Sequence, residues 1–369
     1  MPRTTTRRAT PPVDLDKRDS YQHLDPFDIL GIAVDFPAQV EEAAQVGRAF
    51  CPPDRLRNPA QVVLAGMGGS AVAGDLLSRL TEHTLPVPFL VCRDYVVPAF
   101  VGPNTLFIVS SFSGNTEETI SAAQHALKKK ARVVCITGNG EIAALARRRK
   151  LPLITIPRHN PNMPPRSALG YSLIPMVMMF ESLGLYPGAS RDLKETLAVL
   201  RQQCQELHPD VPTRRNLAKQ LAKALFMKIP VIQGTVGVMS AAAYRWRTQL
   251  NENSNMIALS SEYSELNHNE VVGWELQKEL GRQLEVVTLT RPGDHPHIKA
   301  RVEITQAMVA RKAKVHLVEA QGKSLLAQTL WATGLGDFMS IYLAYLNGAD
   351  PAAIKNIIEL KQRLKEKFG

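Results

Sequence analysis

T-L-F-I-V-S-S-F-S-G-N-T-E-E-T-I-S-A-A-Q-H-A-L-K-K-K, residues 105–130, begins as an apolar, β-prone run and ends as a segment typical of a helix. Between the two lies a turn rich in hydroxyl groups, made of Ser110, Ser111, Ser113, Gly114, Asn115 and Thr116. Two glutamates follow the turn and three lysines close the segment, which matches the charge preference at the two ends of a helix. The segment therefore predicts a strand, a polar turn and a helix in direct succession.

The polar turn precedes the first turn of the predicted helix, where four backbone N–H groups have no partner within the helix. Such a helix start carries a partial positive charge and suits an anion, phosphate above all. The alternative is that Ser113 and Thr116 merely cap the helix while the other hydroxyls fill a turn. This segment alone favours neither interpretation.

The rest of the chain continues the same alternation. Strands are predicted at 62–65, 87–92, 106–109, 132–137, 153–156, 230–233, 256–259, 284–289 and 314–318. Helices are predicted at 70–80, 116–130, 141–149, 171–185, 191–207, 216–226, 238–250, 271–280, 297–311, 324–346 and 352–367. This order predicts an α/β protein whose parallel sheets are doubly wound, with helices on both faces.

The chain of 369 residues is long enough for two domains of similar architecture in tandem. We expect a disordered basic tail at 1–14, a first domain at 15–207 and a second at 208–369, joined at the Pro-rich segment 208–212. The first domain begins with two short helices within 26–50, separated near Pro37.

The two halves differ at the ends of their strands. In the first half, strand 62–65 ends in G-M-G-G-S (66–70) and strand 106–109 ends in the hydroxyl-rich turn. The matching strands of the second half end in Q-G-T-V-G (233–237) and T-R-P-G-D (290–294). Only the first half is equipped for a phosphate group.

Composition narrows the classes of function. The formal charge of +10 comes from scattered basic residues, and clusters such as 147–150 fall at the end of a predicted helix, so we expect no nucleic-acid partner. The four cysteines, Cys51, Cys92, Cys135 and Cys204, lack metal-site or redox spacing and are expected to be buried thiols of a reducing compartment. No apolar run is long enough for a membrane span and no signal peptide is apparent, which favours a cytoplasmic protein.

The glycines of segment 66–70 allow a tight turn and a close approach of the backbone to a ligand. A purely structural turn is the plain alternative. A dinucleotide site is a weaker rival because the G-x-G-x-x-G spacing is absent and Arg93-Asp94 is the closest match to the ribose-binding acid. The P-loop pattern does not occur.

Two downstream segments carry groups suited to acid–base chemistry. Arg166 lies in the Pro-rich loop 157–170 just before a helix, where a guanidinium can stabilise an oxyanion, although a solvated loop arginine is the simpler interpretation. The cluster N-E-N-S (251–254) places Glu252 at a helix end, and His268 follows in N-H-N-E (267–270). These two can form an acid/base pair on one substrate, whereas metal binding lacks the usual His/Glu spacing.

Taken together, G-M-G-G-S, S-F-S-G-N-T-E-E-T, P-P-R-S-A-L-G, N-E-N-S and E-L-N-H-N-E resemble the bifunctional phosphoglucose/phosphomannose isomerases, which contain two sugar isomerase (SIS) domains. The resemblance covers nearly the whole chain. It implies that Gly69, Ser70, Ser111, Ser113 and Thr116 bind the phosphate of a sugar phosphate. It also implies that Glu252 is the catalytic base, Arg166 stabilises the cis-enediolate, and His268, supplied by the neighbouring subunit of a homodimer, helps to open the sugar ring. A C-terminal site lysine matches Lys361, or else Lys355.

The implied reaction is the interconversion of glucose 6-phosphate, and also mannose 6-phosphate, with fructose 6-phosphate, without a metal or nucleotide cofactor. Such chemistry needs a carboxylate, a nearby cation and an anchor for the phosphate. Two rivals stay open: a non-catalytic SIS protein that senses a sugar phosphate, and an aminosugar isomerase of the amidotransferase type. Asn255-Met256 and the basic tail depart from the family pattern and leave the choice between glucose and mannose phosphates open.

Overall fold

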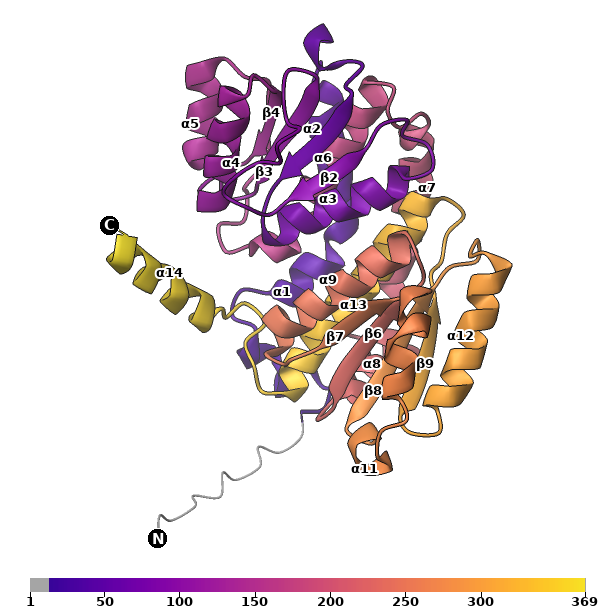
Figure 1. The fold of residues 1–369 in the computed structure, drawn as a ribbon. Helices are drawn as coiled ribbons and strands as arrows, with labels where there is room; N and C mark the ends of the chain where they lie inside the picture. Colours follow the sequence, from indigo (N-terminus) through magenta and orange to yellow (C-terminus); the bar gives the residue numbers. More distant parts are fainter. Residues whose placement is uncertain (1–12, 369) are drawn as a thin grey trace.

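The computed structural model describes residues 13–368 and contains two parallel sheets in two α/β domains (Figure 1). The first sheet has the order β2-β1-β3-β4-β5 and the second the order β7-β6-β8-β9. The first five strands are β1 (Gln61–Ala65), β2 (Phe89–Cys92), β3 (Thr105–Ser111), β4 (Arg132–Thr137) and β5 (Leu153–Thr155). The others are β6 (Ile229–Gly234), β7 (Leu259–Glu262), β8 (Leu284–Thr290) and β9 (Lys314–Glu319). The predicted fold class is confirmed. Most of the predicted tail lies outside the described residues.

Helices cover both faces of the first sheet. Residues 62 and 64 of β1 contribute to a core with α2 (Phe36–Ala49), α3 (Gly68–Thr81) and α6 (Leu169–Ser182). Residues 63 and 65 face the opposite way, toward α4 (Glu117–Lys128) and α5 (Gly140–Arg149). Successive side chains of a strand point to opposite faces of the sheet. Because helices cover both faces, every residue of β3 is buried.

The second sheet is built in the same way. Helices α8 (Leu217–Leu225), α9 (Val238–Ser254) and α13 (Leu325–Leu346) share a core with one face, and α12 (Pro296–Val309) covers the other. The largest apolar core extends from the first sheet to the second and includes residues of α1 (Ile29–Val34) and α7 (Ala189–Glu206). Because α7 packs against α13 as well as α2, the predicted domain boundary at 207/208 stays a prediction.

Short 3-10 helices connect these elements. They are η1 (Arg18–Ser20), η2 (Gln22–Leu24), η3 (Asp54–Leu56), η4 (Pro165–Ser167), η5 (Thr213–Arg215) and η6 (Glu265–His268). The predicted break between two starting helices is confirmed, since α1 ends at Val34 and α2 begins at Phe36 with Pro37 in its first turn. Proline is tolerated there because the first N–H groups of a helix have no intrahelical partner.

The predicted helix at 271–280 is wrong. The chain forms only two single turns there, α10 (Glu270–Gly273) and α11 (Lys278–Gly281). Gly273 is the third residue of the predicted helix, no residue from 270 to 280 is buried, and Trp274 is only partly buried against the second sheet. A helix without a packed face gains little beyond its weak intrinsic propensity, so the segment stays irregular.

The predicted strand at 256–259 begins too early. Helix α9 continues through Ser254, and Asn255 ends it in the left-handed conformation with φ of 52°. Strand β7 therefore begins only at Leu259. The longer α9 places N-E-N-S in the last helical turn, which confirms the prediction of an acid at a helix end.

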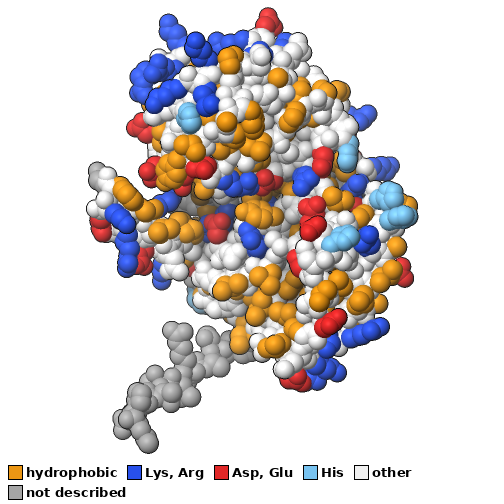
Figure 2. All heavy atoms as spheres, in the orientation of Figure 1, with side chains coloured by type: hydrophobic (Ala, Val, Ile, Leu, Met, Phe, Trp, Pro, Cys, Tyr) orange, Lys and Arg blue, Asp and Glu red, His pale blue; other side chains and the backbone are white. Residues whose placement is uncertain are grey.

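Two features of the surface stand out. Basic side chains are spread over the visible face (Figure 2). Those of 147–149 lie in the last turn of α5, as predicted. Helix α14 (Lys355–Phe368) extends away from both domains and has no buried residue (Figure 1).

Candidate active site

The hydroxyl-rich turn follows β3 at the carboxyl edge of the first sheet. The Ser111 hydroxyl lies 3.0 Å from that of Thr116 and accepts a hydrogen bond from the Gly114 N–H at 3.1 Å. Gly114 has a φ of 75°, and a Cβ atom there would lie 1.6 Å from the Asn139 carbonyl oxygen, so only glycine fits. Thr116 stands at the N-cap of α4, yet its side chain caps no N–H of the helix. The simple capping alternative therefore does not account for this hydroxyl.

The glycine-rich turn follows β1, the strand next to β3, and lies beside the hydroxyl-rich turn. A Cβ on Gly66 would lie 3.0 Å from the Ser110 carbonyl oxygen. Ser70 is buried in the first turn of α3, directly after Gly68 and Gly69. The two turns thus bring all the predicted phosphate-binding residues to one edge of the sheet, as expected where parallel strands end together.

Gly69 also joins this edge to the loop of Arg166. A Cβ atom on Gly69 would lie 2.9 Å from the Pro165 carbonyl oxygen and 3.5 Å from the Arg166 Cα. The absence of a side chain thus lets η4 approach the start of α3 closely. Arg166 consequently stands beside the predicted phosphate-binding residues.

Arg166 is 3% exposed and held on three sides. Its Nε donates to Asn253 Oδ1 at 2.6 Å, its Nη1 lies 3.4 Å from Glu252 Oε2, and its Nη2 donates to the Pro351 carbonyl. Burial lowers the pKa of the Arg166 guanidinium, and the carboxylates of Glu252 and Asp350 oppose that shift. The interpretation as a solvated loop arginine is therefore wrong.

Glu252 contributes the carboxylate of the site. Its side chain is 31% exposed, in the last turn of α9, and faces the Arg166 guanidinium. Both side chains line a cavity of about 130 Å³, whose wall also includes Gly68 and Gly69 of the first domain. An acid, a cation and a helix N-terminus therefore surround one cavity between the two domains.

Ser113 lines a second cavity, of about 340 Å³. Arg166 lines this cavity too and so stands between the two spaces. The cavity of Ser113 and the cavity of Glu252 thus share one residue, Arg166.

Two predicted site residues are not brought to this cavity within one chain. His268 is exposed in η6, and among residues 13–368 no hydrogen bond or ion pair of its side chain is found. Lys361 is exposed on α14, the helix that extends from the body. Lys355 lies nearer, because it lines an open groove that Glu252 also lines. The roles of His268 and of the two lysines stay predictions.

Several residues of the cavity were not predicted. Tyr244, Arg245, Thr248 and Gln249 line it from α9, and Arg93 lines it from the segment after β2. The sequence offered one signal for these residues, their spacing, because positions 245, 248, 249 and 252 fall on one face of a helix. Without knowledge of which face met the first domain, that spacing was equally typical of a structural helix.

Comparisons with known proteins agree with this architecture. Residues 55–185 match the family described as "SIS domain", and residues 214–364 match "Bacterial phospho-glucose isomerase C-terminal SIS domain". The chain is 39% identical over 333 residues to a protein of Caldicellulosiruptor bescii named bifunctional phosphoglucose/phosphomannose isomerase, covering 90% of this chain and 97% of the relative. The chain belongs to this family. A bifunctional phosphoglucose/phosphomannose isomerase of Thermoplasma acidophilum is 35% identical, with 82% of this chain and 89% of the relative covered.

Solved structures support the same fold at lower identity. A hypothetical protein of Thermus thermophilus superposes with a TM-score of 0.72 at 18% identity, covering 94% of this chain and 92% of the other. A glucose-6-phosphate isomerase like protein of the same organism gives a TM-score of 0.62 at 19% identity, covering 93% of this chain and 99% of the other.

Among the helices of the described residues, none has the length and apolar character that crossing a membrane requires.

Proposed function

We propose that the chain is an aldose–ketose isomerase that interconverts glucose 6-phosphate and mannose 6-phosphate with fructose 6-phosphate. The observation that carries the proposal is the Glu252–Arg166 pair, 3.4 Å apart in a cavity that begins at the glycine turn of the first domain. Membership of the phosphoglucose/phosphomannose isomerase family supports the choice of substrates.

In the proposed reaction, the phosphate binds at the start of α3 and α4, where unpaired N–H groups and the hydroxyls of Ser70, Ser111, Ser113 and Thr116 are available. Glu252 removes the proton from C2 of the aldose and returns it to C1, through a cis-enediol intermediate. The Arg166 guanidinium stabilises the negative oxygen that develops next to that carbon. No step of this scheme uses a metal or nucleotide cofactor.

The test is turnover of fructose 6-phosphate by the purified chain in deuterated water. We expect both aldose phosphates to form, with solvent deuterium at C2, because the proton passes through a side chain. The Glu252→Gln variant should lose about 10³-fold or more in kcat while calorimetry still shows substrate binding. Glu262→Gln is the matched control, since Glu262 is 34% exposed and pairs with Arg79 outside this cavity.

The outcomes separate the alternatives. Full activity of the Glu252→Gln variant would remove Glu252 from the mechanism. Binding of sugar phosphates by the unmodified chain without any turnover would favour the sensor. Isomerisation of glucosamine 6-phosphate in preference to glucose 6-phosphate would favour the aminosugar isomerase.

We further propose that the chain acts as a homodimer in which His268 enters the site of the neighbouring subunit. The exposure of His268 in η6 supports this, as does α14, whose apolar side chains are uncovered in a single chain. These are Ile357, Ile358, Leu360, Leu364 and Phe368, from 38% to 78% exposed. Lys361 lies on the same helix and would reach a site with it.

Complementation between inactive chains tests the donation of His268. Neither the Glu252→Gln nor the His268→Ala variant should be active alone. Co-expressed, they should recover about a quarter of the activity, since random pairing leaves one intact site in half of the dimers. Recovery of no activity in dimers shown by sedimentation to be mixed would mean that His268 acts within its own subunit.

A cytoplasmic location is part of this proposal. All four cysteines are free, as in proteins of reducing compartments; three are buried, as predicted, whereas the prediction of burial is wrong for Cys51, which is exposed. Fluorescence microscopy of a tagged chain in its own host would test the location.

A further inference from the structure

We propose that Asp337 and Arg245 are positioning residues that hold the Arg166 guanidinium in place for the isomerisation. The inference rests on the proposed function. Arg245 lies on α9, Asp337 on α13 and Arg166 in η4, so the set joins three elements that are distant in sequence. Neither Asp337 nor Arg245 is assigned contact with the reacting atoms.

The first link runs through the backbone of Arg166. Arg245 Nη2 donates to the Arg166 carbonyl oxygen at 3.0 Å and to both carboxylate oxygens of Asp337, at 2.9 and 2.8 Å. The Arg245 side chain is 1% exposed and that of Asp337 is 15% exposed. A single buried nitrogen therefore ties the loop of Arg166 to α13.

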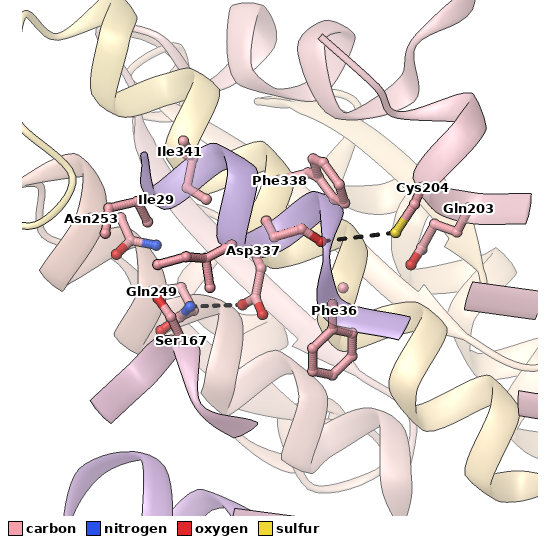
Figure 3. A pocket seen from close by; sticks show the side chains of 13 residues that line it. Ile29, Phe36, Ser167, Gln203, Cys204, Gln249, Asn253, Asp337, Phe338 and Ile341 are labelled. Carbon is pink, nitrogen blue, oxygen red and sulfur yellow. Dashed lines mark hydrogen bonds between the residues drawn. The ribbon is translucent and has the colours of Figure 1, made fainter. Parts of the chain in front are cut away.

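The second link runs to the guanidinium itself. Asn253 accepts from Arg166 Nε and donates to the Ser340 hydroxyl at 2.9 Å, and Ser340 in turn donates to the Asp337 carbonyl oxygen at 3.0 Å. Gln249 adds a hydrogen bond to Asp337 Oδ1 at 2.7 Å, drawn as a dashed line in Figure 3. Residue 337 thus supports Arg166 at both ends, through its side chain and through its backbone.

The spacing along α9 explains how this arises. Arg245, Gln249 and Asn253 are four residues apart and form one stripe that faces α13. Glu252, one position before Asn253, lines the cavity, and so do Arg245 and Gln249 of the stripe. The helix therefore holds the proposed base next to the residues that fix the cation.

Asp337 also compensates buried positive charge. Arg166 and Arg245 are both buried cations, and the charge of Arg245 disfavours the charged form of Arg166. Asp337 and Glu252 supply the two compensating carboxylates. Burial raises the pKa of Asp337 and the Arg245 charge opposes the shift, so this carboxylate is retained at a desolvation cost.

A buried ion pair is weak evidence for stability, because apolar residues of similar size often replace one without loss. The pair nevertheless stands directly behind the proposed catalytic cation. A misplacement of about 1 Å at such a group can reduce a rate about 10²-fold. Positioning therefore explains the location better than stabilisation does.

The experiment uses the full chain and measures kcat, KM and thermal stability with fructose 6-phosphate. Asp337→Asn should lower kcat about 10- to 100-fold with KM changed less than about threefold, because substrate binding depends on the phosphate. A hydroxamate analogue of the enediolate, carrying the same phosphate, should lose more affinity by calorimetry than fructose 6-phosphate does, since only the analogue presents the anionic oxygens to Arg166.

The double variant Arg245→Met/Asp337→Leu separates positioning from stability. It should recover the melting temperature lost in Asp337→Asn, because no unpaired buried charge remains, yet keep the low kcat. Lys219→Met is the matched control. Lys219 is fully buried and pairs with Asp16 at 3.3 Å, away from the cavity, so it should lose stability with kcat unchanged.

Recovery of kcat together with stability in the double variant would overturn the positioning role, as would a normal kcat in Asp337→Asn. If the unmodified chain is inactive on every sugar phosphate, the proposed function fails and this inference fails with it. An active unmodified chain with unaffected variants leaves the proposed function standing and rejects the positioning role alone.

Discussion

The turn after β3 and the turn after β8 occupy matching places in two sheets, because the order β7-β6-β8-β9 repeats β2-β1-β3-β4 without a counterpart of β5, yet different groups fill the two turns. After β3, the hydroxyls of Ser111 and Thr116 lie together at the start of α4. After β8, the Asp294 carboxylate accepts from the Thr235 hydroxyl at 2.8 Å and from the Arg291 N–H at 2.9 Å. The second domain thus supplies its own buried anion where the first presents hydroxyls.

The comparison offers a reason why the proposed phosphate site lies in only one of two similar domains. Oriented N–H and hydroxyl donors at the end of a strand favour negative charge in both domains. Asp294, 7% exposed and also paired with Arg291, satisfies those donors within the chain. The second domain is free to contribute Glu252 and to position Arg166 instead.

The largest effect on activity is expected from a substitution that makes the turn after β3 resemble the turn after β8. Ser113→Asp places a carboxylate beside the proposed phosphate position, and two such charges about 4 Å apart repel by about 4 kcal/mol at an effective dielectric constant of about 20. We expect kcat/KM for fructose 6-phosphate to fall about 10³-fold, mainly through KM. Ser113→Ala, which only removes a hydroxyl, should cost about tenfold. Equal losses in the two variants would argue against a phosphate at this turn.

A smaller effect is expected from removing the carboxylate that fills the turn after β8. Asp294→Ala leaves the Thr235 hydroxyl and the Arg291 N–H without their acceptor, at a cost of about 1–3 kcal/mol in the free energy of unfolding by urea. Turnover should change less than about twofold, because the turn belongs to no proposed site. Inorganic phosphate should raise the melting temperature of this variant more than that of the unmodified chain. A variant as stable as the unmodified chain would show that Asp294 is not the group that fills the turn.

The smallest effect concerns the joint between the two parts of the chain. Glu195 of α7 accepts hydrogen bonds from the N–H groups of Lys323 and Ser324 at the start of α13, at 2.5 and 2.9 Å. Burial alone raises the pKa of Glu195, but these hydrogen bonds and the charge of Lys323 outweigh burial and lower it.

Because the pKa is lower in the folded chain, the stabilisation by Glu195 is present above its unfolded value of about 4.3 and is lost as the pH falls through the folded value. Glu195→Gln should flatten this acid dependence, with a change below about 1 kcal/mol because the group is partly exposed. Urea titrations between pH 3 and 7 measure it. A difference between the two chains that grows toward acid pH would have the wrong sign.

Local pattern was sufficient for most of the fold. The strands of the first sheet are continuous apolar runs bounded by turn residues, so β1, β3 and β4 were located within two residues. Prediction failed between β7 and β8, where segment 271–280 has the composition of a helix but buries none of its residues, and Trp274 packs only partly buried against the second sheet. Whether a segment with a helical pattern forms a helix depends on the surface it packs against, which the local sequence does not reveal.

The sequence by itself determined which chemistry was available: the hydroxyls around Ser113, the acid at Glu252, the guanidinium of Arg166 and a blank turn at 290–294. Motif residues are informative because their backbone needs are local, as with Gly114. Only the tertiary structure decided that Glu252 faces Arg166, that Arg245 and Asp337 support it, and that Asp294 fills the second turn. These contacts join residues 59 to 92 positions apart, and the packing of whole helices and sheets, not any local preference, brings them together.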